Sequence, residues 1–484
     1  MKTILRLLGV LIVVGAIGCI LNDPFLYMVP FCLVCYILFA IALLAIIVLP
    51  GKALWNSLLR RRCAPKWEKR VYYLTSLTIV LVLLFVFASA TSREPSEEER
   101  LEKLKSLPYL VWTSVMMENA DKRGISIYDH QKTYNGLNFY NHIESPSAHI
   151  MTMSGDIIHS WFAEMNPDDK WMYVKLLPDG DILALVEYKR LERLDWNSRI
   201  EWAIPGRFHH DIAKAPNGDI YSLSRKDDII YYHHLPVPVL NDRIMIFSAT
   251  GIKKGEIPLL TALENYVPPQ RIVRLYRWVL SPKTFFAVIQ QKVMGKPILT
   301  SDTPADIMHI NNVEILKRGL DGIYKKGDLL ISARDLDLVF VMDPATRDIK
   351  WSWGPGEISQ QHNPAQLENG NILIFDNGVG RYYSRVIELD PLTKKIVWEY
   401  KENPPERFYT FRRGANERLP NGNTLITESD KGRVFEVTPE GEIVWEFFNP
   451  INNPRDENQR AALYRFARII DPDMYPCLKR LEKE

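Results

Sequence analysis

Histidines stand at matching places in a repeated sequence pattern. His210 and His362 each lie eight residues before the glycine of an Asn-Gly pair, at Gly218 and Gly370. Asn-Gly is a strong hairpin signal because both central residues of a type I′ turn take a positive φ. His309 opens a similar strand, although a longer connection separates it from its turn. The sequence therefore predicts histidines at the start of three hairpin strands.

The expected hairpin register brings these histidines close to polar partners. With each turn centred on its Asn-Gly pair, His362 lies opposite Asn377 and His210 opposite Arg225, and the matching slot after His309 holds Arg334. Arginine binds oxyanions through its fork of N–H donors, and histidine can serve as nucleophile, acid or metal ligand. Such a cluster suits a small anionic ligand. Three histidines could hold zinc, but their spacing gives zinc no support, so no metal or other cofactor is expected.

A second repeated unit alternates with these hairpins and indicates the fold. It is a short turn followed by an apolar strand that ends in tryptophan, with copies at Trp161, Trp202, Trp351, Trp398 and Trp445 and a sixth copy at 250–253 that lacks the tryptophan. Two hairpin signals in each period of about 40 to 50 residues are typical of a four-stranded propeller blade, whereas a β-sandwich does not repeat in this way. We expect an all-β six-bladed β-propeller over residues 124–452. Its innermost strands would bring the histidines to one mouth of a central channel.

The first ninety residues are apolar in three blocks. The blocks span about residues 4–21, 25–49 and 72–90, each close to the roughly 20 residues that cross a bilayer. Seven Lys and Arg residues lie between the second and third blocks, which predicts that this link and the N-terminus are cytoplasmic. We therefore expect three N-terminal transmembrane helices, with residues 1–92 as an anchor in the inner membrane. A lipoprotein cleavage site before Cys19 is the alternative.

This topology delivers the rest of the chain to the periplasm or the extracellular space. Residues 93–123 are expected to form a helical linker, and residues 453–484 a C-terminal tail to which no function is assigned. The net charge of +2 gives no argument for nucleic-acid binding. Four of the five cysteines lie in the first 63 residues, so the repeat domain has no disulfide framework, and Cys32 and Cys35 are interpreted as small apolar residues.

A series of motifs in the second half of the chain matches a known family. It consists of Ile-Ser-Ala-Arg-Asp-Leu-Asp at 331–337, Gln-His-Asn-Pro at 361–364 and Phe-Asp-Asn-Gly at 375–378, followed by Arg381. This series resembles the arylsulfate sulfotransferase family, in particular its membrane-anchored relatives, over about residues 124–470. The resemblance implies a six-bladed propeller that moves a sulfuryl group from a phenolic sulfate to another phenol through a transient sulfohistidine, without a nucleotide donor. It also implies that His210 and His362 are channel histidines and that Arg381 binds sulfate.

The chain departs from that family at one important place. The family's nucleophilic histidine follows these motifs, but here no histidine follows His362, and the matching slot of the next hairpin holds Gly414. Three interpretations remain. One of His210, His309 or His362 has become the nucleophile, or the sulfuryl group passes directly between bound partners, or the propeller binds a sulfated or phenolic ligand without chemistry.

The resulting hypothesis is a membrane-anchored, periplasm-facing propeller resembling arylsulfotransferases, with its site at the channel mouth. Its partners would be an aryl sulfate or another small anionic ligand and the lipid bilayer. The alternative is a non-catalytic ligand-binding or scaffolding propeller with protein partners in the cell envelope. A quinone-dependent dehydrogenase propeller is disfavoured, because the sequence has no adjacent cysteine pair. The expected site residues are three catalytic histidines, His210, His309 and His362, with Arg225, Arg334, Arg381, Asn363 and Asn377 as ligands of the substrate.

Overall fold

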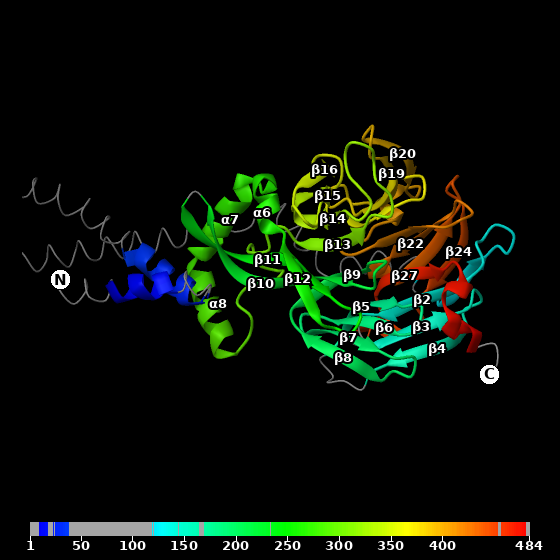
Figure 1. Cartoon of the computed structure of the whole chain (residues 1–484), viewed down its shortest axis with the longest axis horizontal. Helices are drawn as coiled ribbons and strands as arrows, with labels where there is room; N and C mark the ends of the chain where they lie inside the picture. The colour runs from blue at the N-terminus through cyan, green and yellow to red at the C-terminus, as the bar shows by residue number, and fades with distance from the viewer. Residues whose placement is uncertain are drawn as a thin grey trace, which may run out of the picture. The chain divides into compact units, whose positions relative to one another are not determined.

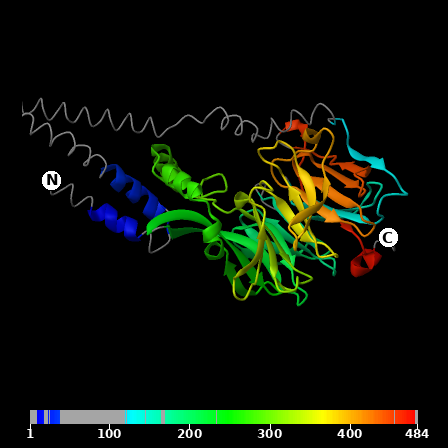
Figure 2. The same cartoon turned by 90° about the horizontal axis from the view of Figure 1, so that it is seen from above.

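The computed structural model contains two compact units, which are described separately (Figures 1 and 2). One unit comprises Met1–Glu99, Asp227–Leu240 and Val267–Ile307, and the other comprises Arg100–Lys226, Asn241–Tyr266 and Met308–Glu484. The long strands β10 (Ile220–Tyr232) and β11 (Leu235–Phe247) belong partly to each. The structure describes residues 9–17, 23, 25–37, 119, 121–143, 145–163, 169–232, 234–453 and 456–480.

The larger unit is a six-bladed β-propeller, which confirms the predicted fold. Four blades are built from four consecutive antiparallel strands. The second blade holds β5 (Trp171–Leu176), β6 (Ile182–Val186), β7 (Arg190–Leu194) and β8 (Ile200–Pro205). The third holds β9 (Phe208–Lys214), β10, β11 and β12 (Lys253–Pro258). The fourth holds β13 (Ile310–Ile315), β14 (Leu329–Ala333), β15 (Leu338–Met342) and β16 (Ile349–Trp353). The fifth holds β17 (His362–Gln366), β18 (Ile372–Asp376), β19 (Arg385–Asp390) and β20 (Lys395–Tyr400).

The two ends of the repeat region close the ring. A strand from the C-terminal end completes the first blade, and a strand from the N-terminal end is added to the last blade. β27 (Leu463–Ile469) is the first strand of the blade that continues with β2 (Leu137–His142), β3 (Ser147–Met151) and β4 (Ile157–Phe162). β1 (Gly124–Tyr128) is added to the last blade, outside β21 (Ala415–Arg418), β22 (Thr424–Glu428), β23 (Arg433–Val437) and β24 (Ile443–Phe448). The propeller therefore reaches Ile469, and the expected boundary at residue 452 is too early. The tail supplies a strand because 463–469 alternates side chains between the two faces of a sheet.

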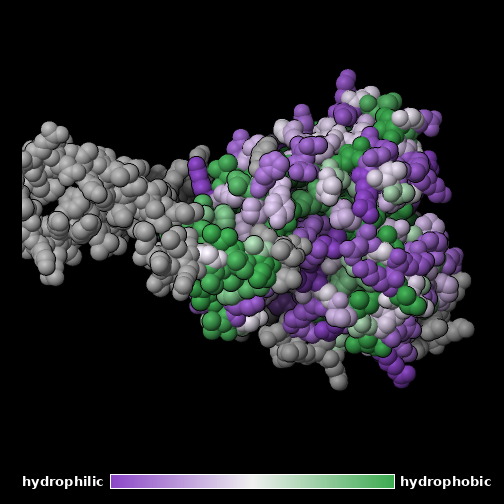
Figure 3. All heavy atoms as spheres, turned by 60° about the vertical axis from the view of Figure 1, so that its left-hand side comes forward, coloured by the Kyte–Doolittle hydropathy of each residue, from purple (hydrophilic) through white to green (hydrophobic). Residues whose placement is uncertain are grey.

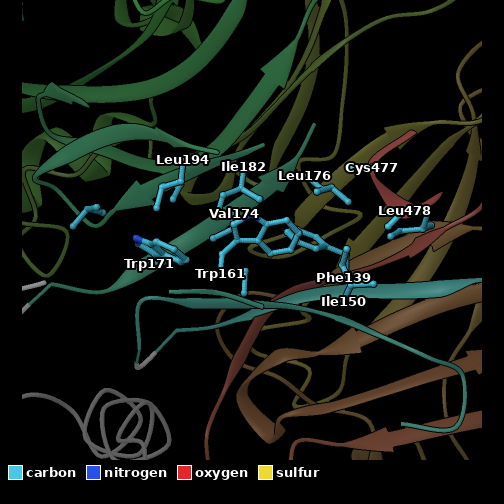
Figure 4. Close-up of a cluster of buried hydrophobic side chains, with 14 residues drawn as sticks. Phe139, Ile150, Trp161, Trp171, Val174, Leu176, Ile182, Leu194, Cys477 and Leu478 are labelled. Carbon is cyan, nitrogen blue, oxygen red and sulfur yellow. The ribbon is translucent and has the colours of Figure 1, made fainter. Parts of the chain in front are cut away.

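The tryptophan unit forms the fourth strand of its blade, which is outermost except where β1 is added beyond β24, and it helps to build the core between blades. Figure 4 shows such a core between the first two blades, where Trp161 of β4 and Trp171 of β5 are fully buried. Cys477 and Leu478, from the last residues of the chain, pack into the same cluster. The side-chain contacts in this core hold neighbouring blades together, and side-chain hydrogen bonds such as that from Asn141 Nδ2 to Trp171 O at 2.9 Å add to them.

The Asn-Gly turns differ from the predicted type I′ turn. In the hairpin of β17 and β18, Leu367 N–H donates to Asn371 O at 2.8 Å and Gly370 N–H donates to Leu367 O at 2.9 Å. Gly370 has a φ of 92°, whereas Asn369 is not among the residues with positive φ. This is a three-residue loop in which only the glycine is left-handed. The extra loop residue shifts the register.

A bulge then shifts the register again at the start of the inner strands. The backbone of His362 pairs with Phe375 rather than with Asn377, and His210 lies in an irregular stretch of β9. His210, His309 and Asn363 have φ values of 58°, 48° and 45°. Positive φ at non-glycine residues costs about 1–3 kcal/mol and is concentrated at functional sites, where bulges re-aim side chains.

The smaller unit contains two N-terminal helical segments, 9–17 and 25–37, and a helical pair, α7 (Pro269–Val279) and α8 (Pro282–Val293). Proline at the first position favours the start of both α7 and α8. Within the ranges that the structure describes, no helix is long and apolar enough to cross a membrane. The expected span at 72–90 lies outside those ranges, as do parts of the other two spans and most of the linker at 93–123.

Candidate functional site

The site lies where the first strands of neighbouring blades meet around the channel. Side chains from these strands bridge the blades directly: Asn311 Nδ2 donates to Gln361 O at 2.9 Å, and Val313 N–H donates to the Asp211 carboxylate at 3.0 Å. His210 lies in β9, His309 directly precedes β13, and His362 is the first residue of β17. The three predicted histidines therefore occupy equivalent places in three successive blades.

His210 is supported by a neighbour that the sequence analysis did not single out. Its Nδ1 lies 2.8 Å from Nδ1 of His209, whose Nε2 lies 3.3 Å from the Asp242 carboxylate. The carboxylate favours a proton on Nε2 of His209, so His209 Nδ1 accepts the Nδ1–H of His210. The Nε2 atom of His210 is then left with a free electron pair, as a base requires.

His362 reaches the same electronic state through an amide. Its Nδ1 lies 2.7 Å from Oδ1 of Asn377. The amide of Asn377 cannot be reversed, because its Nδ2 donates to Thr410 O at 2.9 Å and to Arg413 O at 2.6 Å. Oδ1 must therefore accept the Nδ1–H of His362, which leaves Nε2 unprotonated. The predicted pairing of His362 with Asn377 is realised through side chains, although the backbone register differs.

The histidines influence one another electrostatically. The rings of His210 and His309 are 4.9 Å apart between centroids in an edge-to-face arrangement. Burial lowers the pKa of His210 well below its usual range, and the nearby His309, His209, Arg225 and His362 lower it further. Burial and Arg334 do the same for the pKa of His362. Neutral imidazoles are therefore available throughout the neutral pH range.

Arg465 is a channel residue that the sequence analysis missed. Its Nη1 donates to Asp211 at 2.8 Å, its Nη2 donates to Asn312 at 3.0 Å, and its guanidinium lies 4.7 Å from the ring centre of Tyr173. Burial is the largest influence on its pKa and lowers it, but Asp211, Tyr173 and Tyr464 together raise the pKa of Arg465 above its usual value. The local signal was only the apolar content of Leu-Tyr-Arg-Phe-Ala-Arg-Ile at 463–469, inside the presumed tail, because apolar and charged residues do not alternate there.

The predicted arginines have different surroundings. Arg225 and Asp242 form an ion pair of 3.0 Å in which both side chains are fully buried, so Arg225 balances that carboxylate. Arg334 is partly exposed, donates to Asp335 at 2.6 Å and also contacts Gln360. Arg381 donates to Asp376 at 2.8 Å in the loop after β18. Arg225 and Arg334 are thus the predicted arginines whose charges act on site histidines, His210 and His362 respectively, while Arg381 is bound within its own blade.

Asn363 connects two blades beside the histidines. Its Oδ1 accepts the backbone N–H of Asn416 at 3.0 Å, and its carbonyl oxygen accepts from the amide of Asn416 at 3.3 Å. Both asparagines line a cavity of about 270 Å³ together with Arg465. The cavity continues to Tyr173, Lys175, Glu417 and Tyr475. The cavity combines aromatic rings with Lys and Arg side chains, which suit an anionic ring compound, although Glu417 also lines it and none of the three site histidines does.

A second cavity, of about 290 Å³, lies beside the last blade. Its central cation, Arg433, already forms ion pairs with Glu402, Glu428 and Glu446 at distances of 2.6 to 3.1 Å. Within the described residues, no group of three or more His, Cys, Asp or Glu side chains is arranged to hold a metal ion.

Sequence comparisons decide the family. Two family models, both described as arylsulfotransferase (ASST), match residues 126–360 and 287–450, and together they span 126–450. The chain belongs to the arylsulfotransferase family. It is a sulfotransferase-like enzyme, and the predicted resemblance is confirmed.

Solved structures share only the general architecture with this arylsulfotransferase family member. A protein of unknown function from Bacteroides caccae is 15% identical, with 69% of this chain and 98% of that chain covered and a TM-score of 0.41. Virginiamycin B lyase from Staphylococcus aureus is 12% identical, with 70% and 87% covered and a TM-score of 0.38. BamB from Moraxella catarrhalis is 9% identical, with 67% and 77% covered and a TM-score of 0.29. No curated protein matches the chain.

This arylsulfotransferase family member has no room for a histidine in the slot of Gly414. A Cβ atom at this glycine would lie 2.5 Å from the ring of Phe375, and its φ of 123° disfavours any side chain. Phe375 is fully buried in the core between the last two blades. The later histidine that the resemblance implies is therefore replaced by packing at this slot, and the candidate nucleophiles are the histidines of β9, β13 and β17.

Proposed function

We propose that the chain transfers a sulfuryl group from an aryl sulfate to a phenol or another hydroxyl acceptor in the propeller channel, with His362 as the nucleophile. The observation that supports this role is the hydrogen bond from His362 Nδ1 to Asn377, which directs the free electron pair to Nε2 without a carboxylate behind the ring, whereas His210 is backed by His209 and Asp242. A neutral, oriented imidazole is what nucleophilic catalysis requires.

The reaction proceeds in two displacements. First, Nε2 of His362 forms a bond to sulfur while the bond from sulfur to the phenolic oxygen breaks, and the phenolate leaves with the electron pair. Then the acceptor oxygen attacks the sulfur of the sulfohistidine, the N–S bond breaks and His362 regains its electron pair. His210 takes the acceptor proton through its free Nε2, and the net proton transfer is from the acceptor hydroxyl to the released phenolate.

The remaining channel residues bind and orient the sulfate. His309 is less buried than His210 or His362, so its ring is accessible to a ligand. Arg334 and Arg465 supply positive charge, which stabilises the sulfate oxygens as charge redistributes in the transition state. Asp242 and His209 stabilise the positive charge that His210 acquires when it takes the proton.

We further propose that the enzyme is anchored in the inner membrane, with the propeller in the periplasm or extracellular space. Three apolar blocks in the first ninety residues and the basic link between the second and third support this topology. It would give the site access to sulfate esters and acceptors outside the cytoplasm. Protease protection of the propeller in intact spheroplasts, compared with permeabilised ones, tests the orientation.

Turnover of 4-nitrophenyl sulfate tests the catalytic proposal. We expect release of nitrophenol that accelerates when a phenol acceptor is added, and a His362→Ala variant that folds but does not turn over. His130→Ala, which changes an exposed histidine, is the matched control. Full turnover by His362→Ala would overturn the assignment of the nucleophile.

A ligand-binding propeller without catalysis is the second candidate. Two observations favour this function. Phe375 fills the slot of the family's later histidine, and the channel arginines Arg225, Arg334 and Arg465 each already pair with a carboxylate. This function is supported if calorimetry detects binding of 4-nitrophenyl sulfate while no nitrophenol is released with any of the acceptors tested.

A further inference from the structure

A basic and apolar surface on the smaller unit has no role in the proposed reaction. It is formed by α7 and α8, by residues 294–296 and by the tip of the β10–β11 hairpin, and we call it the helical-pair surface. Its exposed large apolar side chains include Phe286 at 69%, Val293 at 82% and Met294 at 56% exposure. Tyr231 and Leu235 of the hairpin tip are 60% and 54% exposed. Figure 3 shows hydrophobic residues gathered on the surface of this unit.

The helices also bury a separate apolar face, so the exposed residues are in excess of what folding needs. α7 buries Ile272, Leu275 and Val279, spaced three and four residues apart, which is the pattern of one helix face. α8 buries Thr284 and Val288. Phe286 and Val293 lie outside this buried set. Large exposed apolar areas of this kind mark interaction sites.

The charge of the same helices is one-sided. Residues 269–296 contain six Lys or Arg residues and no Asp or Glu. Arg274 and Arg277 of α7 and Lys283, Lys292 and Lys296 of α8 and its end are exposed. Apolar side chains combined with an unbalanced positive charge are the pattern of helices that lie at the interface of an anionic membrane, where basic side chains reach the phosphate groups.

The helical pair is bound to a segment that was predicted to enter the membrane. Helix 25–37 lies in the second apolar block of the sequence, and Cys32 Sγ donates to Val279 O at 2.7 Å. Tyr36 donates to Leu280 O, and Tyr27 donates to Pro236 O at 2.6 Å. Lys292 Nζ lies 5.2 Å from the ring centre of Phe25. These contacts hold α7, α8 and the hairpin tip against the apolar N-terminal segment.

We propose that the helical-pair surface docks on the anionic phospholipid surface of the membrane that receives the N-terminal segment. Phe286, Val293 and Met294 insert among the acyl chains near the headgroups, and the basic side chains contact lipid phosphates. This inference rests on the proposed membrane anchoring and is independent of the proposed catalysis.

The test uses the full-length chain in vesicles of phosphatidylcholine, with or without phosphatidylglycerol. An environment-sensitive fluorescent amino acid replaces Val293. In the control protein it replaces Leu392, which lies on a propeller turn and is 65% exposed. We expect a blue-shifted emission and quenching by brominated lipid at position 293 and not at 392, with stronger quenching when phosphatidylglycerol is present. An Arg274→Gln/Arg277→Gln variant should lose the increment due to phosphatidylglycerol.

Two results would overturn the proposal. One is equal quenching of both labels by aqueous iodide in vesicles. The other is protection of the label at position 293 from iodide in detergent without lipid, if this protection increases with protein concentration. A second copy of the chain would then cover the surface. Flotation of the protein with vesicles separately tests the anchor, and turnover of 4-nitrophenyl sulfate in the same samples separately tests catalysis.

Discussion

Asn377 holds His362 at 2.7 Å between Oδ1 and Nδ1, and its own amide nitrogen is fixed by two backbone carbonyls in the connection that leads into the next blade. The orientation of the imidazole is therefore determined by the contact between two blades of the propeller. This relationship assigns the free electron pair of His362 to Nε2. It also makes Asn377 a positioning residue whose removal should affect catalysis more than binding.

The first prediction concerns this hydrogen bond. Asn377→Ala should lower kcat for 4-nitrophenyl sulfate by about 10²- to 10⁴-fold, the range found when an oriented catalytic histidine loses its partner, with a much smaller change in KM. Asn371→Ala, which removes an asparagine bonded to Glu388 at the turn of the same hairpin, is the control. Equal kcat in both variants would show that the contact is only structural.

The second prediction separates His209 from Asp242. His209→Gln removes the imidazole between Asp242 and His210, so kcat should fall and the acid limb of the pH profile of kcat/KM should move, while the fold persists. Asp242→Asn leaves the buried charge of Arg225 without its carboxylate and should cost about 3–5 kcal/mol of stability. An unchanged pH profile in His209→Gln would contradict its role behind His210.

Arg465 provides the third prediction. Arg465→Lys keeps a charge beside Asp211 but loses the planar fork that also reaches Asn312. KM for the aryl sulfate should rise by about tenfold, or roughly 1.4 kcal/mol. Arg418→Lys, which alters an arginine paired with Glu388, is the matched control and should leave KM unchanged. A KM equal to that of the unaltered enzyme in Arg465→Lys would remove this residue from the binding site.

The fourth prediction concerns packing at the slot of the family's later histidine. Gly414→Ala should destabilise the propeller by about 1–3 kcal/mol, because the new methyl group meets the Phe375 ring and the φ of 123° is unfavourable for alanine. Urea unfolding measures the change. Gly370→Ala, where a Cβ has open space, is strained only by its φ of 92° and separates the two causes. Equal losses in the two variants would show that the contact with Phe375 is unimportant.

The fifth prediction follows from buried neutral histidines. Burial lowers the pKa of His142 to about 3, and of His149 and His209 to about 4. In the unfolded chain these groups bind protons below about pH 6.5, whereas the folded protein does not bind them until the lowered values are reached. Stability should therefore be full above about pH 6.5 and fall progressively towards about pH 4. A free energy of unfolding that is constant across this window would contradict the buried neutral state.

The sequence was sufficient for the fold and for much of the site because both are periodic. The tryptophan units and turn glycines defined six blades, and the position of His362 relative to its turn predicted its partnership with Asn377. The prediction of a type I′ turn was wrong because Asn369 does not take the positive φ that this turn requires at both central residues. A loop with one more residue and a bulge at Asn363 changed the backbone pairing but kept the two side chains together.

Contacts between distant parts of the chain escaped the sequence analysis. Arg465 reaches the channel only because β27 closes the first blade, and the seven residues of β27 lack the alternation of apolar and polar side chains that would mark a strand. His209 acquires a role from Asp242, which lies in another strand of the same blade. Arg381 has an acidic neighbour, Asp376, five positions earlier in the sequence, but their pairing depends on the loop after β18. Such relationships are set by the folded chain rather than by spacing.

Intact-protein and peptide mass spectrometry tests the central claim most directly. The full-length enzyme is incubated with 4-nitrophenyl sulfate without an acceptor, and then digested at alkaline pH, where an N-sulfonated imidazole persists. The account predicts one sulfuryl group on the peptide that contains His362, its loss when a phenol is added, and its absence in His362→Ala. A sulfuryl group on His210 or His309 instead, or release of nitrophenol that proceeds without any modified histidine, would contradict the account.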